Sequence, residues 1–149
     1  MDSPLTSPLH VQAWPDAVVD RLGYEPTSEY FEWLWLPRIG PSCAWAYRRL
    51  TLGLLRQPDG YRIRLDELGH WLGLGGTGQH SPLVRSLRRL EQFGLAVRID
   101  DHTIGIRRRV PPLTLLQLRH LSPVLQAIHL RLTDTAGTGN QLDRAAAAG

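Results

Sequence analysis

Between residues 40 and 110 the spacing of hydrophobic positions changes from a helical to a strand-like period and back. Apolar residues that recur every three or four positions predict amphipathic helices, and short runs that alternate large and polar side chains predict strands. Turn and cap residues such as Pro58–Asp59–Gly60 and Ser81–Pro82 separate these segments. The expected elements, in order, are a helix over 40–57, a strand over 61–65, a helix over 66–72, a helix over 81–93 and a β-hairpin of strands 95–99 and 104–110. The chain is therefore expected to be mainly α with a small β-hairpin.

The helix over 81–93 has two chemically different faces. Three leucines form an apolar stripe that predicts its buried side, whereas Arg85, Arg88 and Arg89 fall on the other side. The order helix, strand, helix, helix, hairpin is that of a winged helix-turn-helix, in which the third helix enters the major groove of DNA. We therefore expect this helix to bind double-stranded DNA. The residues expected to contact bases or nearby phosphates are Gln79, His80, Ser81, Arg85, Arg88 and Arg89.

The hairpin over 95–110 is the expected wing. Its turn, Asp100–Asp101, is acidic and unsuited to direct phosphate contact, but arginines flank it on both strands. Strand alternation places Arg107 and Arg109 on one face and Arg108 on the other. We expect Arg98, Arg107 and Arg109 to contact phosphates and the helix over 81–93 to dominate DNA recognition.

Charge is unevenly distributed along the chain. All 17 basic residues are arginine, and the formal net charge is +3. Residues 1–35 carry six carboxylates against one arginine, whereas residues 36–132 carry fifteen arginines against six carboxylates. A basic body of this kind is typical of a polyanion-binding protein, because arginine is a good bidentate ligand for phosphate and guanine. A solvated arginine-rich surface, reflecting codon bias in a GC-rich genome, is the alternative interpretation.

Residues 65–98, LDELGHWLGLGGTGQHSPLVRSLRRLEQFGLAVR, resemble the helix-turn-helix core of MarR-like and related winged-helix regulators. In those proteins a turn of small residues precedes a helix that ends in R-x-L-x-x-L-x-x-x-G-L. A longer stretch, about residues 28–121, from EWLWLPRIGPS to RRRVPPLTLLQLRHL, resembles a group of uncharacterised actinobacterial winged-helix-like proteins. The resemblance implies a winged-helix fold and, for the regulators, a role in transcription.

The two ends of the chain are expected to extend this core. Residues 1–26 are predicted to be a flexible acidic head with a short helix over 15–22. Residues 27–132 are predicted to be the winged-helix domain with N- and C-terminal helical extensions, including a helical stretch over 114–132 interrupted near Pro123. Residues 133–149, rich in Thr, Gly and Ala, are predicted to be a disordered tail.

Apolar residues outside the winged core leave two alternatives open. Tyr30, Phe31, Trp33 and Trp35 are expected either to pack in the core or to bind a protein partner. The leucine-rich stretch 113–132 and this aromatic segment are expected either to pair two copies in a homodimer or to pack on each other within one monomer. If DNA is not the ligand, a winged-helix protein–protein interaction module in a larger assembly is the alternative function.

Other chemistries are not expected. The stretch 73–78 matches G-x-G-x-x-G, but a helix precedes it where a dinucleotide-binding motif needs a strand. The six histidines lack metal-ligand spacing, and Cys43 lies on an apolar helical stripe typical of a buried structural thiol. We therefore expect no enzyme activity, no cofactor and no metal. No apolar run is long enough to span a bilayer, and a single cysteine is consistent with a reducing cytoplasm.

Overall fold

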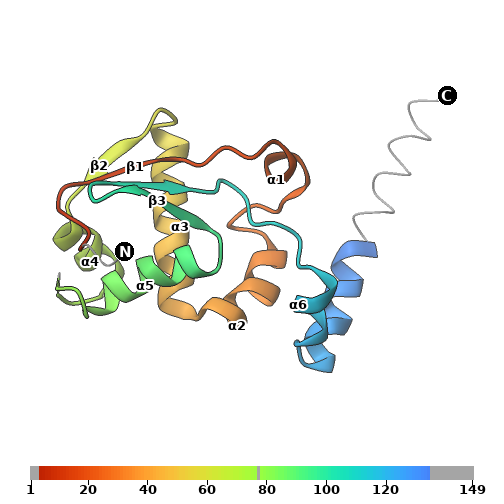
Figure 1. Cartoon of the computed structure of the whole chain (residues 1–149). Helices are drawn as coiled ribbons and strands as arrows, with labels where there is room; N and C mark the ends of the chain where they lie inside the picture. The colour runs from red at the N-terminus through yellow and green to blue at the C-terminus, as the bar shows by residue number, and fades with distance from the viewer. Residues whose placement is uncertain (1–3, 77, 135–149) are drawn as a thin grey trace.

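A four-stranded sheet packed against helices forms the body of the molecule (Figure 1). The computed structural model describes residues 4–76 and 78–134. The strands are β1 (Leu9–Ala13), β2 (Tyr61–Ile63), β3 (Ala96–Asp100) and β4 (Thr103–Ile106), in the spatial order β2-β1-β4-β3. The fold is therefore mixed α/β, and the expectation of a mainly helical chain with one small hairpin is only partly right.

Strand β1 overturns the expectation that the part of residues 1–26 before the short helix is a flexible head. It lies inside the sheet, antiparallel to β2 and parallel to β4. The side chains of Leu9 and Val11 are fully buried beneath it, while His10 and Gln12 lie on the other face. The sequence indicates this strand only by a five-residue alternation of apolar and polar positions. That alternation is short, and the serines and prolines around it are typical of a flexible segment. Paired on both edges, the strand is a structural part of the domain.

The helices between residues 40 and 92 form where the hydrophobic period predicts them. In chain order the helical elements are α1 (Ala17–Leu22), the π-helical turn η1 (Phe31–Trp35), α2 (Leu36–Ile39), α3 (Pro41–Arg56), α4 (Leu65–Leu72), α5 (Pro82–Gln92), α6 (Leu115–Arg119) and a helix over 123–134. The glycine-rich turn after α4 starts at Gly73, whose left-handed φ of 68° ends the helix. The hairpin β3–β4 also forms, but β4 ends at Ile106 instead of continuing to residue 110.

The core lies where α3, α4 and α5 pack on one another and on the sheet. Helix α3 contacts β1, and α5 contacts β3. Fully buried leucines at positions 50, 68, 83, 87 and 90 link the three helices. The Tyr47 hydroxyl donates a 2.7 Å hydrogen bond to the Arg107 carbonyl, which ties α3 to the chain leaving the sheet. This packing buries one face of α5 and leaves the other face toward solvent.

The aromatic segment around η1 belongs to the core. Tyr30, Phe31 and Trp35 are buried, so the expectation that they bind a partner is wrong for these three residues. Together with Leu34 they repeat at i, i+1, i+4 and i+5, which puts them on one side of a helical turn. Trp33 lies on the opposite side and remains 44% exposed. Core packing, one of the two alternatives, is therefore what the sequence pattern produces.

The C-terminal helical stretch breaks near Pro123, as predicted. Helix α6 ends at Arg119, and the next helix starts at Pro123 after Ser122, whose hydroxyl accepts from the Leu125 N–H at 3.4 Å. His129 lies edge-on to Tyr30 at 5.6 Å between ring centroids, so this helix and the aromatic segment pack on each other. The predicted disordered tail starts at 133, but residues 133–134 are helical and 135–149 lie outside the described residues.

Candidate nucleic-acid interface

Helix α5 presents an arginine-bearing face to solvent. It begins after the N-cap Ser81, whose hydroxyl accepts a 3.3 Å hydrogen bond from the Val84 N–H. Its leucine stripe is fully buried against α3, α4 and β3. On the other side Arg85 and Arg89 are exposed, and Arg88 is half-buried beside them. The two faces predicted from the sequence are therefore the two faces of the folded helix.

A hollow of about 490 Å³ runs between this face and the start of α3. We call it the arginine groove, and its polar and backbone walls are Gly40, Pro41, Ser42, Arg85, Arg88 and Arg89. None of the described residues that line it is acidic. The N-terminus of the 16-residue helix α3 adds the positive end of its dipole and first-turn N–H groups. Every charge and dipole at this surface therefore favours an anion.

The arginines of the groove are not neutralised by the rest of the described chain. Within residues 4–76 and 78–134, the side chains of Arg85 and Arg88 make no hydrogen bond or ion pair. Arg89 reaches the Arg38 carbonyl at 3.4 Å and lies over the Phe93 ring at 5.5 Å, so it too has no carboxylate partner. Burial raises the pKa of the neighbouring Cys43 thiol to about 12, so that side chain adds no negative charge. The groove keeps three full positive charges.

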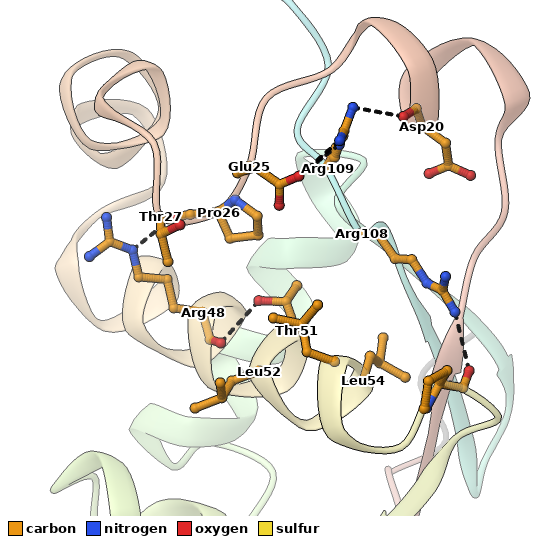
Figure 2. A pocket seen from close by; sticks show the side chains of 12 residues that line it. Asp20, Glu25, Pro26, Thr27, Arg48, Thr51, Leu52, Leu54, Arg108 and Arg109 are labelled. Atoms are coloured by element: carbon orange, nitrogen blue, oxygen red, sulfur yellow. Dashed lines mark hydrogen bonds and ion pairs between the residues drawn. The ribbon is translucent and has the colours of Figure 1, made fainter.

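Unlike the groove arginines, the wing arginines that were expected to contact phosphates lie beside carboxylates of the same chain. Arg109 pairs with Glu25 at 3.0 Å and donates to the Asp20 carbonyl at 2.9 Å (Figure 2). Arg98 lies 3.7 Å from Glu91. Both guanidinium groups therefore face a carboxylate of the same chain, which lowers their attraction for an external phosphate. We therefore do not propose Arg98 and Arg109 as DNA contacts.

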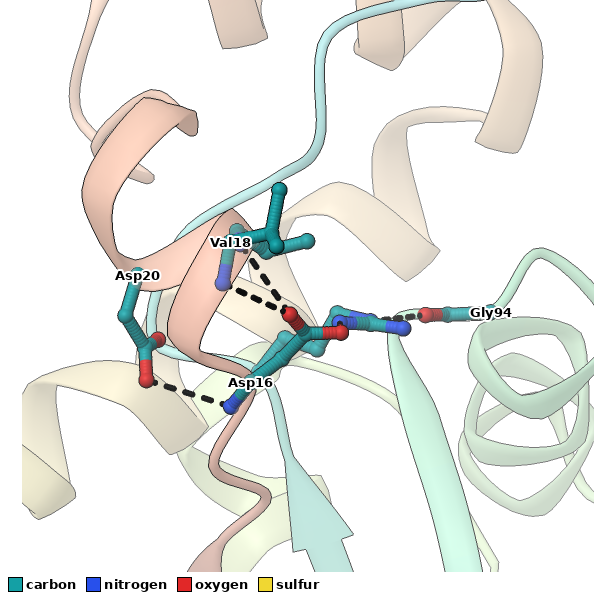
Figure 3. Close-up of polar contacts among 6 residues, drawn as sticks. Asp16, Val18, Asp20 and Gly94 are labelled. Atoms are coloured by element: carbon teal, nitrogen blue, oxygen red, sulfur yellow. Dashed lines mark hydrogen bonds and ion pairs between the residues drawn. The ribbon is translucent and has the colours of Figure 1, made fainter.

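Arg107 is the most enclosed of these side chains. It is 15% exposed, pairs with Asp16 at 2.9 Å, donates to the Gly94 carbonyl at 2.8 Å and stacks over the Trp14 ring at 4.0 Å. Asp16 also caps α1, accepting from the Val18 and Val19 N–H groups (Figure 3). The hydrogen bond from Arg107, followed by those from the backbone, lowers the pKa of the Asp16 carboxyl below its usual value. This ion pair holds the acidic N-terminal segment against the end of the hairpin. Because its guanidinium group is already paired with Asp16, we do not propose Arg107 as a DNA contact.

The tip of the hairpin is short and tied to the N-terminal segment. The Asp100 carboxylate accepts the His102 N–H at 2.7 Å inside the turn. The Thr6 hydroxyl donates to the Asp101 carbonyl at 3.0 Å and also contacts the His102 ring. An acidic tip held in this way offers little to a phosphate backbone.

The remaining predicted contact residues lie at the exposed approach to α5. Gln79 and His80 are exposed in the turn before the helix, and Ser81 uses its hydroxyl to cap it. Sequence reasoning missed Ser42 and the α3 N-terminus as part of the same surface. The signal was the Gly40–Pro41–Ser42 helix start, but only folding brings it beside α5, more than forty residues away in the chain.

Comparison with protein-family models, with curated proteins and with solved structures found no match to this chain. Within the described residues, no helix is long and apolar enough to cross a bilayer. In the same ranges no group of three or more histidine, cysteine and carboxylate side chains gathers as a metal site would require. The arginine groove therefore stands as the strongest candidate site.

Proposed function

We propose that this protein binds double-stranded DNA sequence-specifically through α5 and the arginine groove, and acts as a transcriptional regulator. The observation that carries the proposal is the charge of the groove: three arginines, a helix N-terminus and no lining carboxylate. Three arginines of the hairpin region, Arg98, Arg107 and Arg109, are paired with carboxylates of the same chain, whereas the three arginines of the groove are not. Such a face attracts a polyanion with regularly spaced phosphate groups, such as the DNA backbone.

The element order supports a winged helix as the framework of this proposal. From α3 onward it runs α3, β2, α4, α5, β3, β4, the order expected of that fold. Strand β1 is then an addition that lies between β2 and the hairpin. Helix α5, at eleven residues, is about 16 Å long and can lie in a major groove about 12 Å wide.

The groove residues take separate roles in the proposed complex. Arg85 and the turn residues Gln79 and His80, near the N-terminal end of α5, contact base edges. Arg88 and Arg89, further along the helix beside Ser42, hold backbone phosphates and fix the register of α5. Base contacts give sequence preference, whereas phosphate contacts give affinity that depends on salt.

A binding assay with matched variants tests the proposal. Duplexes selected from a random pool by the wild-type protein are titrated by fluorescence anisotropy at two salt concentrations. Affinity is expected to fall by about 0.9 log units per log unit of salt for each phosphate neutralised. Arg88→Ala should reduce this slope by about one, while Arg85→Ala should relax preference at one base pair at a cost of about 1–3 kcal/mol.

Arg21→Ala is the control for these variants. Arg21 is an exposed arginine at the end of α1, outside the groove, and its loss removes the same charge from the chain. It should leave both the salt slope and the base preference close to wild type. Absence of any rise in the anisotropy of the DNA at low salt, or equal effects of Arg21→Ala and Arg88→Ala, would overturn the proposal.

Exposed apolar side chains on α3 and α4 favour a second candidate, a winged-helix module that binds another protein. Trp45, Leu52 and Trp71 are large, exposed side chains on neighbouring helices. A surface of this kind is typical of protein interfaces. This function is the better account if the folded protein fails to bind DNA and Trp45→Ser or Trp71→Ser leaves its stability unchanged.

We propose that the DNA-binding form is a homodimer. A single module buries only about 600–1,000 Å² of protein surface on DNA, and most such regulators read two half-sites. The helix over 123–134 packs on the aromatic segment of its own chain, so that segment is not the dimer surface proposed here. The C-terminal helices still keep four exposed apolar side chains that a second copy can cover, Leu115, Leu116, Val124 and Leu130. Light scattering at micromolar concentration should give twice the monomer mass, and removal of residues 123–149 should give a monomer that binds DNA much more weakly. A full-length monomer that binds one asymmetric site tightly would contradict this.

A further inference from the structure

A second cavity, of about 410 Å³, lies on the side of α3 where the N-terminal segment crosses the helix. Three segments far apart in the sequence form its walls: residues 20–27, residues 48–58 and Arg108–Arg109 (Figure 2). Its volume falls within the range of small-molecule sites in proteins. Nothing in the proposed DNA contact uses this cavity.

The floor of the cavity is apolar. Leu54 is buried there, while Leu52 and Leu55 are 43% and 76% exposed at its edge, and Pro26 and Pro58 complete the wall. Leu55 follows the buried Leu54 in α3, but its own side chain is largely uncovered by the described chain. An apolar group bound here would remove leucine surface from water, which favours binding.

The charges around the cavity are not balanced. Glu25 and Arg109 form an ion pair and neutralise each other. Arg48 and Arg108 instead donate only to backbone carbonyls, that of Pro26 at 2.8 Å and that of Pro58 at 3.2 Å. A guanidinium group carries five N–H donors, so both side chains retain donors for a ligand.

A single carboxylate, that of Asp20, opposes these two cations. It accepts the Asp16 N–H at 3.2 Å and lies in the first turn of α1, where a negative charge is stabilised by the helix dipole. The rim therefore carries an excess of one positive charge above an apolar floor. This combination matches a ligand with one negative charge and a hydrocarbon body.

We propose that this cavity binds a small amphipathic carboxylate. Its hydrocarbon part lies against Leu52, Leu54 and Leu55, and its carboxylate accepts a charge-assisted, bidentate hydrogen bond from Arg108. Arg108 is the anchor because it is exposed, follows the end of β4 and holds only one carbonyl. The inference is independent of DNA binding.

Three probes with the same hydrocarbon chain length but different head groups test which ligand charge the cavity prefers and where the ligand binds. Octanoate, 1-octanol and octylamine are titrated into the full-length protein at pH 7 and followed by backbone amide NMR. Octanoate is expected to bind at least tenfold more tightly than the other two, and the shifted resonances should map to Leu52, Leu55 and Arg108. Equal binding of octylamine, shifts that map elsewhere, or no binding of any probe would overturn the proposal.

Matched variants test whether Arg108 is the residue that binds the ligand carboxylate. Arg108→Gln should weaken octanoate about tenfold or more and leave octanol unchanged, while Arg56→Gln, an exposed arginine of α3 outside this cavity, should change neither. Leu55→Asp alters an exposed position and should leave the fold intact, but it places a negative charge at the rim and should abolish octanoate binding. Unchanged octanoate affinity in either Arg108→Gln or Leu55→Asp would refute the assignment.

Discussion

Replacing Leu9 by alanine tests whether the N-terminal segment is a structural strand or a flexible head. Leu9 is fully buried in β1 and pairs in register with Ile63 of β2. The strand is hydrogen-bonded on both edges, so the surrounding backbone has little freedom to close the space left by the lost side chain. A cavity should therefore remain beneath the sheet.

The expected loss of unfolding free energy in Leu9→Ala follows from the complete burial of the Leu9 side chain. Leucine-to-alanine changes at fully buried sites lower the free energy of unfolding by about 2–5 kcal/mol, whereas surface changes stay within about 0.5 kcal/mol. Leu22→Ala, on the exposed side of α1, is the matched control. A chain that lacks residues 1–13 also loses Leu5 and Val11. At roughly 1.5–3 kcal/mol for each of the three side chains, the loss approaches the total stability of about 5–15 kcal/mol expected for a small domain.

Urea unfolding followed by tryptophan fluorescence measures these differences. The midpoint of Leu9→Ala should fall clearly, with the slope m unchanged, while Leu22→Ala should unfold with the wild-type midpoint. The truncated chain should show no cooperative transition at 25 °C. A Leu9→Ala midpoint equal to that of Leu22→Ala, or a truncated chain as stable as the full one, would refute the placement of β1 in the sheet.

Three further outcomes are expected. Ser81→Ala removes the hydroxyl that caps α5 and should lower the unfolding free energy by about 1 kcal/mol in urea titration, while Ser81→Asp should not. Iodoacetamide at pH 8 should modify Cys43 far more slowly in the native protein than in urea, because burial raises its pKa to about 12; equal rates would show that the thiol is accessible. Asp16→Asn keeps a helix cap but removes the charge that pairs with Arg107. Because the pKa of Asp16 is lowered in the folded state, its stabilisation is present above the unfolded value near 3.8 and is lost as pH falls through the folded value. Acid unfolding of Asp16→Asn should therefore depend less steeply on pH below the unfolded value near 3.8, and an unchanged pH profile would contradict the Asp16–Arg107 assignment.

Local sequence determined the elements whose signals repeat over several turns. The leucine stripe of α5 at helical spacing, the Ser81 cap and the Gly73 stop each act within a few residues, so they could be interpreted without the fold. The break at Pro123 follows for the same reason, since proline lacks the N–H that a continuing helix needs. The outward position of Arg85 follows from the period of the helix alone.

Contacts between distant segments were decided only by the tertiary structure. The alternation in β1 is five residues long, and its place between two other strands depends on partners about fifty and ninety residues away. Composition showed an acidic N-terminal segment and a basic body, but not that Asp16 would pair with Arg107 and Glu25 with Arg109. The arginines that remain uncompensated are therefore known only after folding, because pairing depends on distances of about 3 Å that no one-dimensional pattern specifies.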